Sequence, residues 1–203
     1  MDIDSVMTLA PVIPVLVVDD VAHARPLAEA LVAGGLPVLE VTLRTPAALE
    51  VIAAMTEVPG AIVGAGTVLS GSDIAGALSA GARFLVSPGI TAALGSAART
   101  SNVPFLPGVA SASDIIRAQE MGFSRLKFFP AVAAGGLPVL RAFTAVFGNV
   151  RFCPTGGITE ASAPEWLAEP AVACVGGSWI AKRGETDWAA IEARARAAAT
   201  LRG

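Results

Sequence analysis

One lysine lies in an otherwise apolar stretch of the chain, residues 126–136, which reads LKFFPAVAAGG. The chain has 14 basic residues, and only Lys127 and Lys182 among them are lysines. An ammonium among apolar side chains is costly to desolvate unless it is paired or gives up its proton. A lysine that has lost its proton attacks a carbonyl carbon, and the resulting imine is an electron sink for breaking a carbon–carbon bond. Lys127 is therefore the candidate nucleophile.

The elements that position this lysine follow a repeating pattern. A short β-branched run precedes a glycine, proline or aspartate, and an alanine- and leucine-rich helical stretch follows. We expect Asp73, Ser113 and Asp187 to be helix N-caps. The pattern predicts strands at 12–18, 38–43, 61–65, 84–87, 104–106, 125–129, 150–153 and 172–175, and helices that include 22–33, 47–55, 72–80, 113–121, 137–147 and 187–201.

Eight strand–helix units in 203 residues predict an α/β fold, a single (β/α)₈ TIM barrel domain that spans residues 1–203. An open, doubly wound sheet is the structural alternative. The stretch AIVGAGT at 61–67 has the G-x-G of a dinucleotide-binding turn, but it lacks the third glycine, and no acidic residue closes a following strand. We therefore reject a dinucleotide site.

Polar side chains gather on the inward face of this barrel. Side chains alternate along a strand, so Glu40 and Arg44 share one face, and Lys127 and Phe129 share another. The same alternation directs Thr67 inward. All lie toward the carboxyl ends of their strands, where barrels of this kind keep their active sites. A buried ion pair between Lys127 and Glu40 could by itself be a structural plug. The additional presence of Arg44 and Thr67 favours a working site.

Two glycine-rich turns are expected after the last two predicted strands. In this fold, the loops at these positions commonly bind phosphate through backbone N–H groups. One such turn alone could be merely a tight connection, whereas two at these positions favour a phosphate site. The residues are Thr155, Gly156, Gly157, Gly176, Gly177 and Ser178.

The composition excludes several classes of function. A net charge of −3 leaves no basic stripe for nucleic acid. The apolar run at 12–18 is far shorter than the ~20 residues of a membrane span, so no membrane partner is expected. The single histidine, His23, disfavours a Ser-His-Asp triad and a histidine zinc site, so we expect no metal or other cofactor. Cys153 and Cys174 lack CxxC spacing, and buried thiols suit a reducing cytoplasm.

A series of motifs in the chain resembles one known family. VLEVTLRT (38–45), GAGTVL (64–69), SPGIT (87–91), KFFPA (127–131), RFCPTGGI (151–158) and GGSW (176–179) are similar to those of the 2-dehydro-3-deoxy-6-phosphogluconate and 4-hydroxy-2-oxoglutarate aldolases (KDPG/KHG aldolases). The resemblance implies a homotrimeric, metal-free class I aldolase barrel of the Entner–Doudoroff pathway. Its substrate would be a phosphorylated 2-keto-3-deoxy sugar acid, cleaved to pyruvate and glyceraldehyde 3-phosphate.

The resemblance also implies roles for individual residues. Lys127 would be the Schiff-base lysine and Glu40 the general acid/base. Arg44 and Thr67 would hold the keto-acid carboxylate. Pro88 and Phe129 would line the pocket, and the residues at 155–157 and 176–178 would bind the phosphate.

Three residues depart from the family pattern, and they concern the recognition of the sugar hydroxyls. Ala110, Val132 and Ala134 stand where polar residues are frequent. The sequence does not distinguish the gluconate substrate from its galactonate epimer, whose aldolase is the first alternative. A phosphosugar epimerase would need metal-binding histidines. A non-catalytic phosphate-binding barrel, the alternative of another class, would be expected to have lost Lys127 or Glu40.

Overall fold

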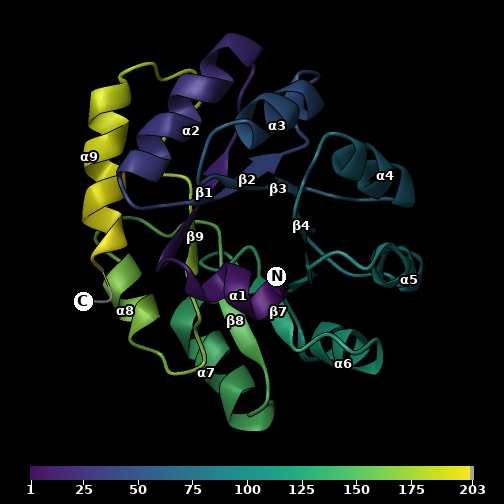
Figure 1. The fold of residues 1–203 in the computed structure, drawn as a ribbon. Helices are drawn as coiled ribbons and strands as arrows, with labels where there is room; N and C mark the ends of the chain where they lie inside the picture. Colours follow the sequence, from purple (N-terminus) through teal and green to yellow (C-terminus); the bar gives the residue numbers. More distant parts are fainter. Residues whose placement is uncertain (202–203) are drawn as a thin grey trace.

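The computed structural model describes residues 1–201 of the chain, in which parallel strands form a closed barrel with helices around it (Figure 1). This confirms the predicted α/β barrel, and residues 202–203 of the predicted domain lie outside the described residues. The strands are β1 (Val12–Leu16), β2 (Val38–Thr42), β3 (Ile62–Gly66), β4 (Leu85–Val86), β5 (Phe105–Leu106), β6 (Gly108–Val109), β7 (Arg125–Phe128), β8 (Arg151–Pro154) and β9 (Val175–Gly177).

The barrel is divided into two hydrogen-bonded sheets. One runs in the order β5-β4-β3-β2-β1-β9, and the other is β6-β7-β8. Bridges from Phe152 to Val172 and from Thr155 to Gly176 join β8 to the segment that ends in β9. On the other side the chain passes directly from β5 to β6 through Pro107, which has no N–H to donate. The short β5 and β6 together therefore occupy one of the eight predicted strand positions.

Helices cover the outside of the barrel, as Figure 1 shows for α2 to α9. They are α1 (Ile3–Thr8), α2 (Ala24–Ala33), α3 (Ala48–Thr56), α4 (Gly71–Ser79), α5 (Ala92–Ser101), α6 (Ala112–Glu120), α7 (Gly136–Val146), α8 (Ala163–Leu167) and α9 (Trp188–Ala199), with a 3₁₀ turn at Val21–His23. None of the helices in residues 1–201 is long and apolar enough to cross a membrane.

The helix caps differ in part from the prediction. Asp187 caps α9 as expected, accepting a hydrogen bond from the N–H of Ala190. The prediction is wrong for Asp73, because Ser70 is the cap of α4 and Asp73 instead accepts from the N–H of Leu69. Ser113 is likewise replaced by Ser111. In both helices the serine hydroxyl accepts a hydrogen bond from the N–H of an aspartate three residues later, and that aspartate accepts one from the N–H of the residue before the serine, an arrangement close to a capping box.

The barrel strands separate two apolar cores. Leu39 and Val41 belong to the cluster between strands and helices. Val38, on the opposite face of β2, belongs to a second cluster that includes Phe84 and Leu106 and no residue of α2 to α9. The second cluster therefore fills the inside of the barrel. The alternation predicted for β2 is confirmed.

Helix α1, which the sequence pattern did not indicate, closes the amino-terminal end of the barrel. Its Val6 and Met7 are fully buried in the inner cluster. Burial of one such side chain stabilises a fold by roughly 1.5–3 kcal/mol. On the same helix Asp4 accepts two hydrogen bonds of 2.5 Å from the guanidinium of Arg125, the first residue of β7. The interior is therefore plugged at this end.

Candidate active site

Above the apolar plug, two buried charged side chains meet from opposite sheets. The Nζ of Lys127 on β7 donates a 3.0 Å hydrogen bond to the Oε1 of Glu40 on β2. Lys127 is only 5% exposed and Glu40 only 3%. Each charge is therefore compensated by the other, and the hydrogen bond gives the lysine proton a direct path to the carboxylate. The structure brings these two predicted residues together.

Two glycines of β3 make room for the interior side chains. A Cβ on Gly66 would overlap the carboxylate of Glu40, and a Cβ on Gly64 would overlap the ring of Phe84. In the register of β2 and β3, Glu40 lies beside Gly64 and Thr42 beside Gly66; in that of β3 and β4, Ala65 lies beside Leu85, the residue after Phe84. The glycines of AIVGAGT thus serve the packing of the barrel interior.

Arg44 and Thr67 form the next contact toward the rim. Arg44 lies just past β2, and its Nε donates a 3.1 Å hydrogen bond to the Oγ1 of Thr67. Thr67 follows β3 with a φ of 59°, a left-handed conformation that a β-branched residue rarely adopts. Such strain persists where the surroundings hold the residue in place, and it is often found at functional sites.

A cavity of about 110 Å³ lies over Lys127. The ring of Phe129 covers the amine, with its centroid 5.4 Å from Nζ. Val15 and Ile158 also line the cavity, although the sequence reasoning did not name them; the alternation of strand 12–18 could have indicated Val15. The other lining residues are Arg44, Lys127, Phe129, Thr155, Gly156, Gly157, Gly176 and Ser178.

The two predicted glycine turns differ from each other. Gly156 and Gly157 have φ values of 102° and 78°, so that turn requires residues free of a Cβ. Gly176 and Gly177, in contrast, are the end of β9 and pair with β1, so the expected strand at 172–175 is wrong in position. A Cβ on Gly176 would overlap the side chain of Thr155, so this glycine permits close packing of β9 on the residue that follows β8.

Four of the predicted residues do not line the Lys127 cavity: Glu40 and Thr67, whose contacts are described above, and Pro88 and Gly177. Pro88 lines a separate, larger cavity of about 350 Å³, together with Leu69 and Ile90. Gly177 is covered by the ring of Trp179, which a Cβ would overlap. Within the described part of the chain, no three His, Cys, Asp or Glu side chains are grouped so that they could hold a metal ion.

The arrangement has the parts needed for imine chemistry. An amine lies at the bottom of an apolar pocket, and a carboxylate is within proton-transfer distance of it. A guanidinium that can bind a carboxylate lies at the same cavity. The left-handed turn at Gly156 and Gly157 lines the same cavity.

Comparison with known proteins assigns the chain to a family. The sequence model described as "Aldolase: KDPG and KHG aldolase" matches residues 3–194. The 2-dehydro-3-deoxy-phosphogluconate aldolase of Zymomonas mobilis is 57% identical over 201 residues, 99% of this chain and 97% of its own. The chain belongs to the KDPG and KHG aldolase family.

Solved structures of KDPG aldolases have the same fold. The Zymomonas mobilis enzyme with 3-phosphoglycerate superposes with a TM-score of 0.97 at 57% identity, covering 99% of this chain and 96% of the other. The Legionella pneumophila KDPG aldolase, with pyruvate captured as a covalent carbinolamine intermediate, superposes with a TM-score of 0.95 at 45% identity, covering 98% of each chain. The family assignment therefore rests on both sequence and fold.

Proposed function

We propose that this chain is a class I, Schiff-base aldolase that cleaves 2-dehydro-3-deoxy-6-phosphogluconate to pyruvate and glyceraldehyde 3-phosphate, the aldolase step of the Entner–Doudoroff pathway. The observation that carries the proposal is the hydrogen bond between the buried Lys127 amine and the Glu40 carboxylate beneath the cavity. Support comes from the 57% identical aldolase and from the relative captured with covalently bound pyruvate.

The chemistry begins at Lys127. Transfer of its proton to Glu40 leaves a neutral amine, which attacks the C2 carbonyl of the substrate and forms a carbinolamine. Glu40 returns its proton to the carbinolamine oxygen, water leaves, and the protonated imine forms while Glu40 is again a carboxylate. Glu40 then removes the C4 hydroxyl proton, and the C3–C4 bond breaks as its electrons move into the imine to form an enamine. The aldehyde leaves, Glu40 returns a proton to C3, and hydrolysis of the imine releases pyruvate and restores the amine.

The cavity walls would hold the two anionic ends of the substrate. Arg44, oriented by its hydrogen bond to Thr67, binds the keto-acid carboxylate next to the imine carbon. At the far end, the backbone of the turn at Gly156 and Gly157 and that of Ser178, the first residue after β9, bind the phosphate. The ring of Phe129 packs over the nitrogen of the imine.

The test is a coupled assay for pyruvate release. We expect cleavage of 2-dehydro-3-deoxy-6-phosphogluconate, slower cleavage of the non-phosphorylated 4-hydroxy-2-oxoglutarate, and no loss of rate with a chelator. Faster cleavage of the galactonate epimer would transfer the assignment to that substrate. The absence of pyruvate from all three substrates would exclude the aldolase proposal.

We also propose that the working form is a homotrimer in the cytoplasm. Large apolar side chains on the outside give support, because Leu69 and Val146 are 63% and 74% exposed. The buried thiols of Cys153 and Cys174 suit a reducing compartment. Sedimentation at micromolar concentration checks the trimer, and a stable monomer of 20.4 kDa would contradict it.

A further inference from the structure

The segment between β9 and α9 leaves directly from the proposed phosphate site. Its first residue, Ser178, lines the cavity over Lys127, and two residues later Ile180 is fully buried. Trp179 does not anchor the segment by hydrogen bonding, because its buried indole N–H has no acceptor within residues 1–201. Pairing of Gly177 with β1 holds Ser178 from one side, and contacts further along the segment hold it from the other.

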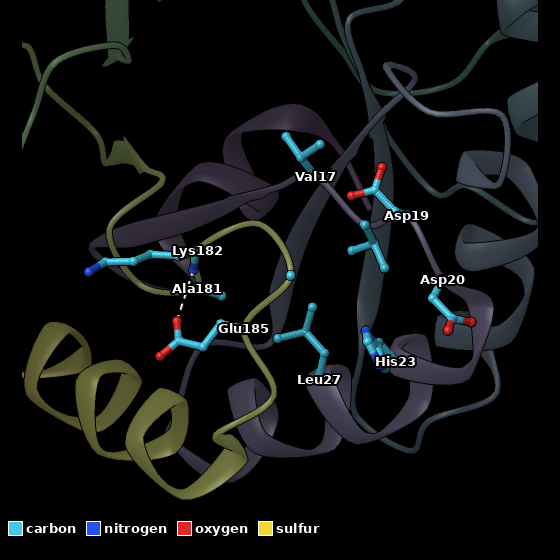
Figure 2. A pocket seen from close by; sticks show the side chains of 10 residues that line it. Val17, Asp19, Asp20, His23, Leu27, Ala181, Lys182 and Glu185 are labelled. Atoms are coloured by element: carbon cyan, nitrogen blue, oxygen red, sulfur yellow. Dashed lines mark hydrogen bonds between the residues drawn. The ribbon is translucent and has the colours of Figure 1, made fainter.

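One arginine of α9 holds this segment at two points. The Nε of Arg194 donates a 2.8 Å hydrogen bond to the carbonyl oxygen of Ile180, and its Nη2 donates a 2.7 Å hydrogen bond to the carboxylate of Glu185. The other oxygen of Glu185 accepts a 3.0 Å hydrogen bond from the N–H of Lys182, drawn as a dashed line in Figure 2. A single guanidinium thus connects both ends of residues 180–185 to a helix.

This connection is partly buried and charge-assisted. The side chains of Arg194 and Glu185 are only 27% and 20% exposed. The hydrogen bond from Arg194, followed by that from the N–H of Lys182, lowers the pKa of Glu185, which therefore stays ionised at neutral pH. Hydrogen bonds of this kind are shorter and stronger than neutral ones, and the fork of an arginine can make two at once.

A second ion pair on the same segment is much more exposed. Arg183 binds both carboxylate oxygens of Asp19, but the two side chains are 64% and 48% exposed. Ion pairs in such positions contribute little to stability. Between the segment and residues 17–20, which follow β1, lies a cavity of only about 80 Å³, and Figure 2 shows the ammonium of Lys182 extending away from it. Arg194 is thus the main polar anchor of the segment.

We propose that Arg194 is a positioning residue for the phosphate site. By fixing Ile180 and Glu185 it holds the backbone at Ser178 in the place where it meets the phosphorylated end of the substrate. It touches neither the substrate nor the reacting atoms, so its loss should weaken binding of the phosphorylated end and leave the imine chemistry intact. The proposal rests on the proposed function, and it adds a residue of α9, which is not itself part of the rim loops.

The experiment compares Arg194→Gln with Arg196→Gln. Arg196 lies on the same helix and pairs with Glu192 in a largely exposed position, so it is the matched control. We expect Arg194→Gln to raise KM for 2-dehydro-3-deoxy-6-phosphogluconate about tenfold, the size expected when a charge-assisted hydrogen bond is lost. The kcat for both substrates and the KM for 4-hydroxy-2-oxoglutarate should stay within about twofold of wild type. Arg196→Gln should change none of them.

Inorganic phosphate, titrated by calorimetry, provides a second readout that needs no catalysis. Weaker phosphate binding by Arg194→Gln than by Arg196→Gln supports the positioning role even if wild-type protein cleaves neither substrate, an outcome that would exclude only the proposed function. Equal phosphate affinity in the two variants overturns the positioning role, as does an equal rise of KM for both substrates. If Arg194→Gln does not fold, Arg194→Lys, which keeps the charge but loses the fork, is measured in the same way.

Discussion

Arg125 and Lys127 lie two residues apart on the same face of β7, and each forms an ion pair with an acidic side chain from a distant part of the chain. Arg125 faces the amino-terminal end of the barrel and binds Asp4 through both arms of its guanidinium. Lys127 faces the carboxyl end and donates one hydrogen bond to Glu40. Asp4 is 48% exposed, whereas the side chains of Lys127 and Glu40 are 6% and 4% exposed.

The difference shows how one strand serves two purposes. A guanidinium is always charged and its planar fork matches a carboxylate, so Arg125 is suited to holding α1 across the amino-terminal end of the barrel. An amine has a single nucleophilic atom and can exist without its proton, so Lys127 is suited to bond formation. The same kind of ion pair is therefore structural at one end of β7 and chemical at the other.

Exchanging the two cations is the strongest test of this division. Lys127→Arg should abolish cleavage, because a guanidinium is not a usable nucleophile, while Arg125→Lys should keep near wild-type kcat. Incubation of wild type with pyruvate and borohydride should inactivate the protein and add one reduced pyruvate mass at Lys127, read by peptide mass spectrometry. Labelling at Lys182 with activity following that site would contradict the assignment.

The partner of Lys127 should matter nearly as much. Glu40→Gln keeps the shape and a hydrogen bond but cannot accept a proton, so exchange of the pyruvate methyl protons with D₂O should fall by roughly 10²–10⁴-fold. Proton NMR of pyruvate measures the exchange, and borohydride should still trap some imine after long incubation. Methyl exchange at the wild-type rate would show that Glu40 is only a counter-ion of Lys127.

A charge placed at the rim should affect affinity alone. Ser178→Asp brings a carboxylate to the proposed phosphate site, and repulsion should raise KM for the phosphorylated substrate by about tenfold or more. Cleavage of 4-hydroxy-2-oxoglutarate, which has no phosphate, should stay near wild type in the same steady-state assay. Equal losses on both substrates would mean that this residue serves the structure only.

The smallest effect is expected from breaking the ion pair between Asp4 and Arg125 at the amino-terminal end of the barrel. Asp4→Asn should lower the free energy of unfolding by about 1 kcal/mol or less, since the pair is partly exposed, and should leave kcat and KM unchanged. Denaturant unfolding followed by circular dichroism measures the difference. A clear loss of kcat would show that the two ends of β7 are not independent.

The same variant tests a pH dependence. The hydrogen bonds from Arg125 lower the pKa of Asp4 below its ordinary value of 3.8. A carboxyl whose pKa is lowered by folding adds stability that is complete above the ordinary value and is lost as the pH falls through the folded value. The difference in stability between wild type and Asp4→Asn should therefore be constant from neutral pH down to about pH 5 and shrink below pH 4.

The residues at the centre of the candidate site could be found from the sequence because local geometry places them. Alternation along a strand is enough to put Glu40 and Lys127 on inward faces, and both are buried in the barrel. The closure of the barrel then brings them together, although they are 87 residues apart in sequence. Once a barrel is assumed, no further tertiary information is needed.

Other features depend on contacts that no local pattern reveals. Helix α1 has only six residues, and its place depends on the inner cluster and on Arg125, 121 residues away. Gly176 and Gly177 look like a turn, yet pairing with β1 at the other end of the chain makes them a strand. Pro88 lines a separate cavity, and its backbone packs so closely on Gly108 of β6 that a Cβ there would overlap it.

The plug formed by α1 has a kinetic consequence. Because Val6 and Met7 fill the amino-terminal end of the barrel, substrates and products must pass through its other end. In the proposed reaction the fragment bonded to Lys127 lies deepest, and the fragment that carries the phosphate lies nearest the rim. Products therefore leave in a fixed order, the aldehyde first and pyruvate last, and in the direction of synthesis pyruvate must enter before the aldehyde.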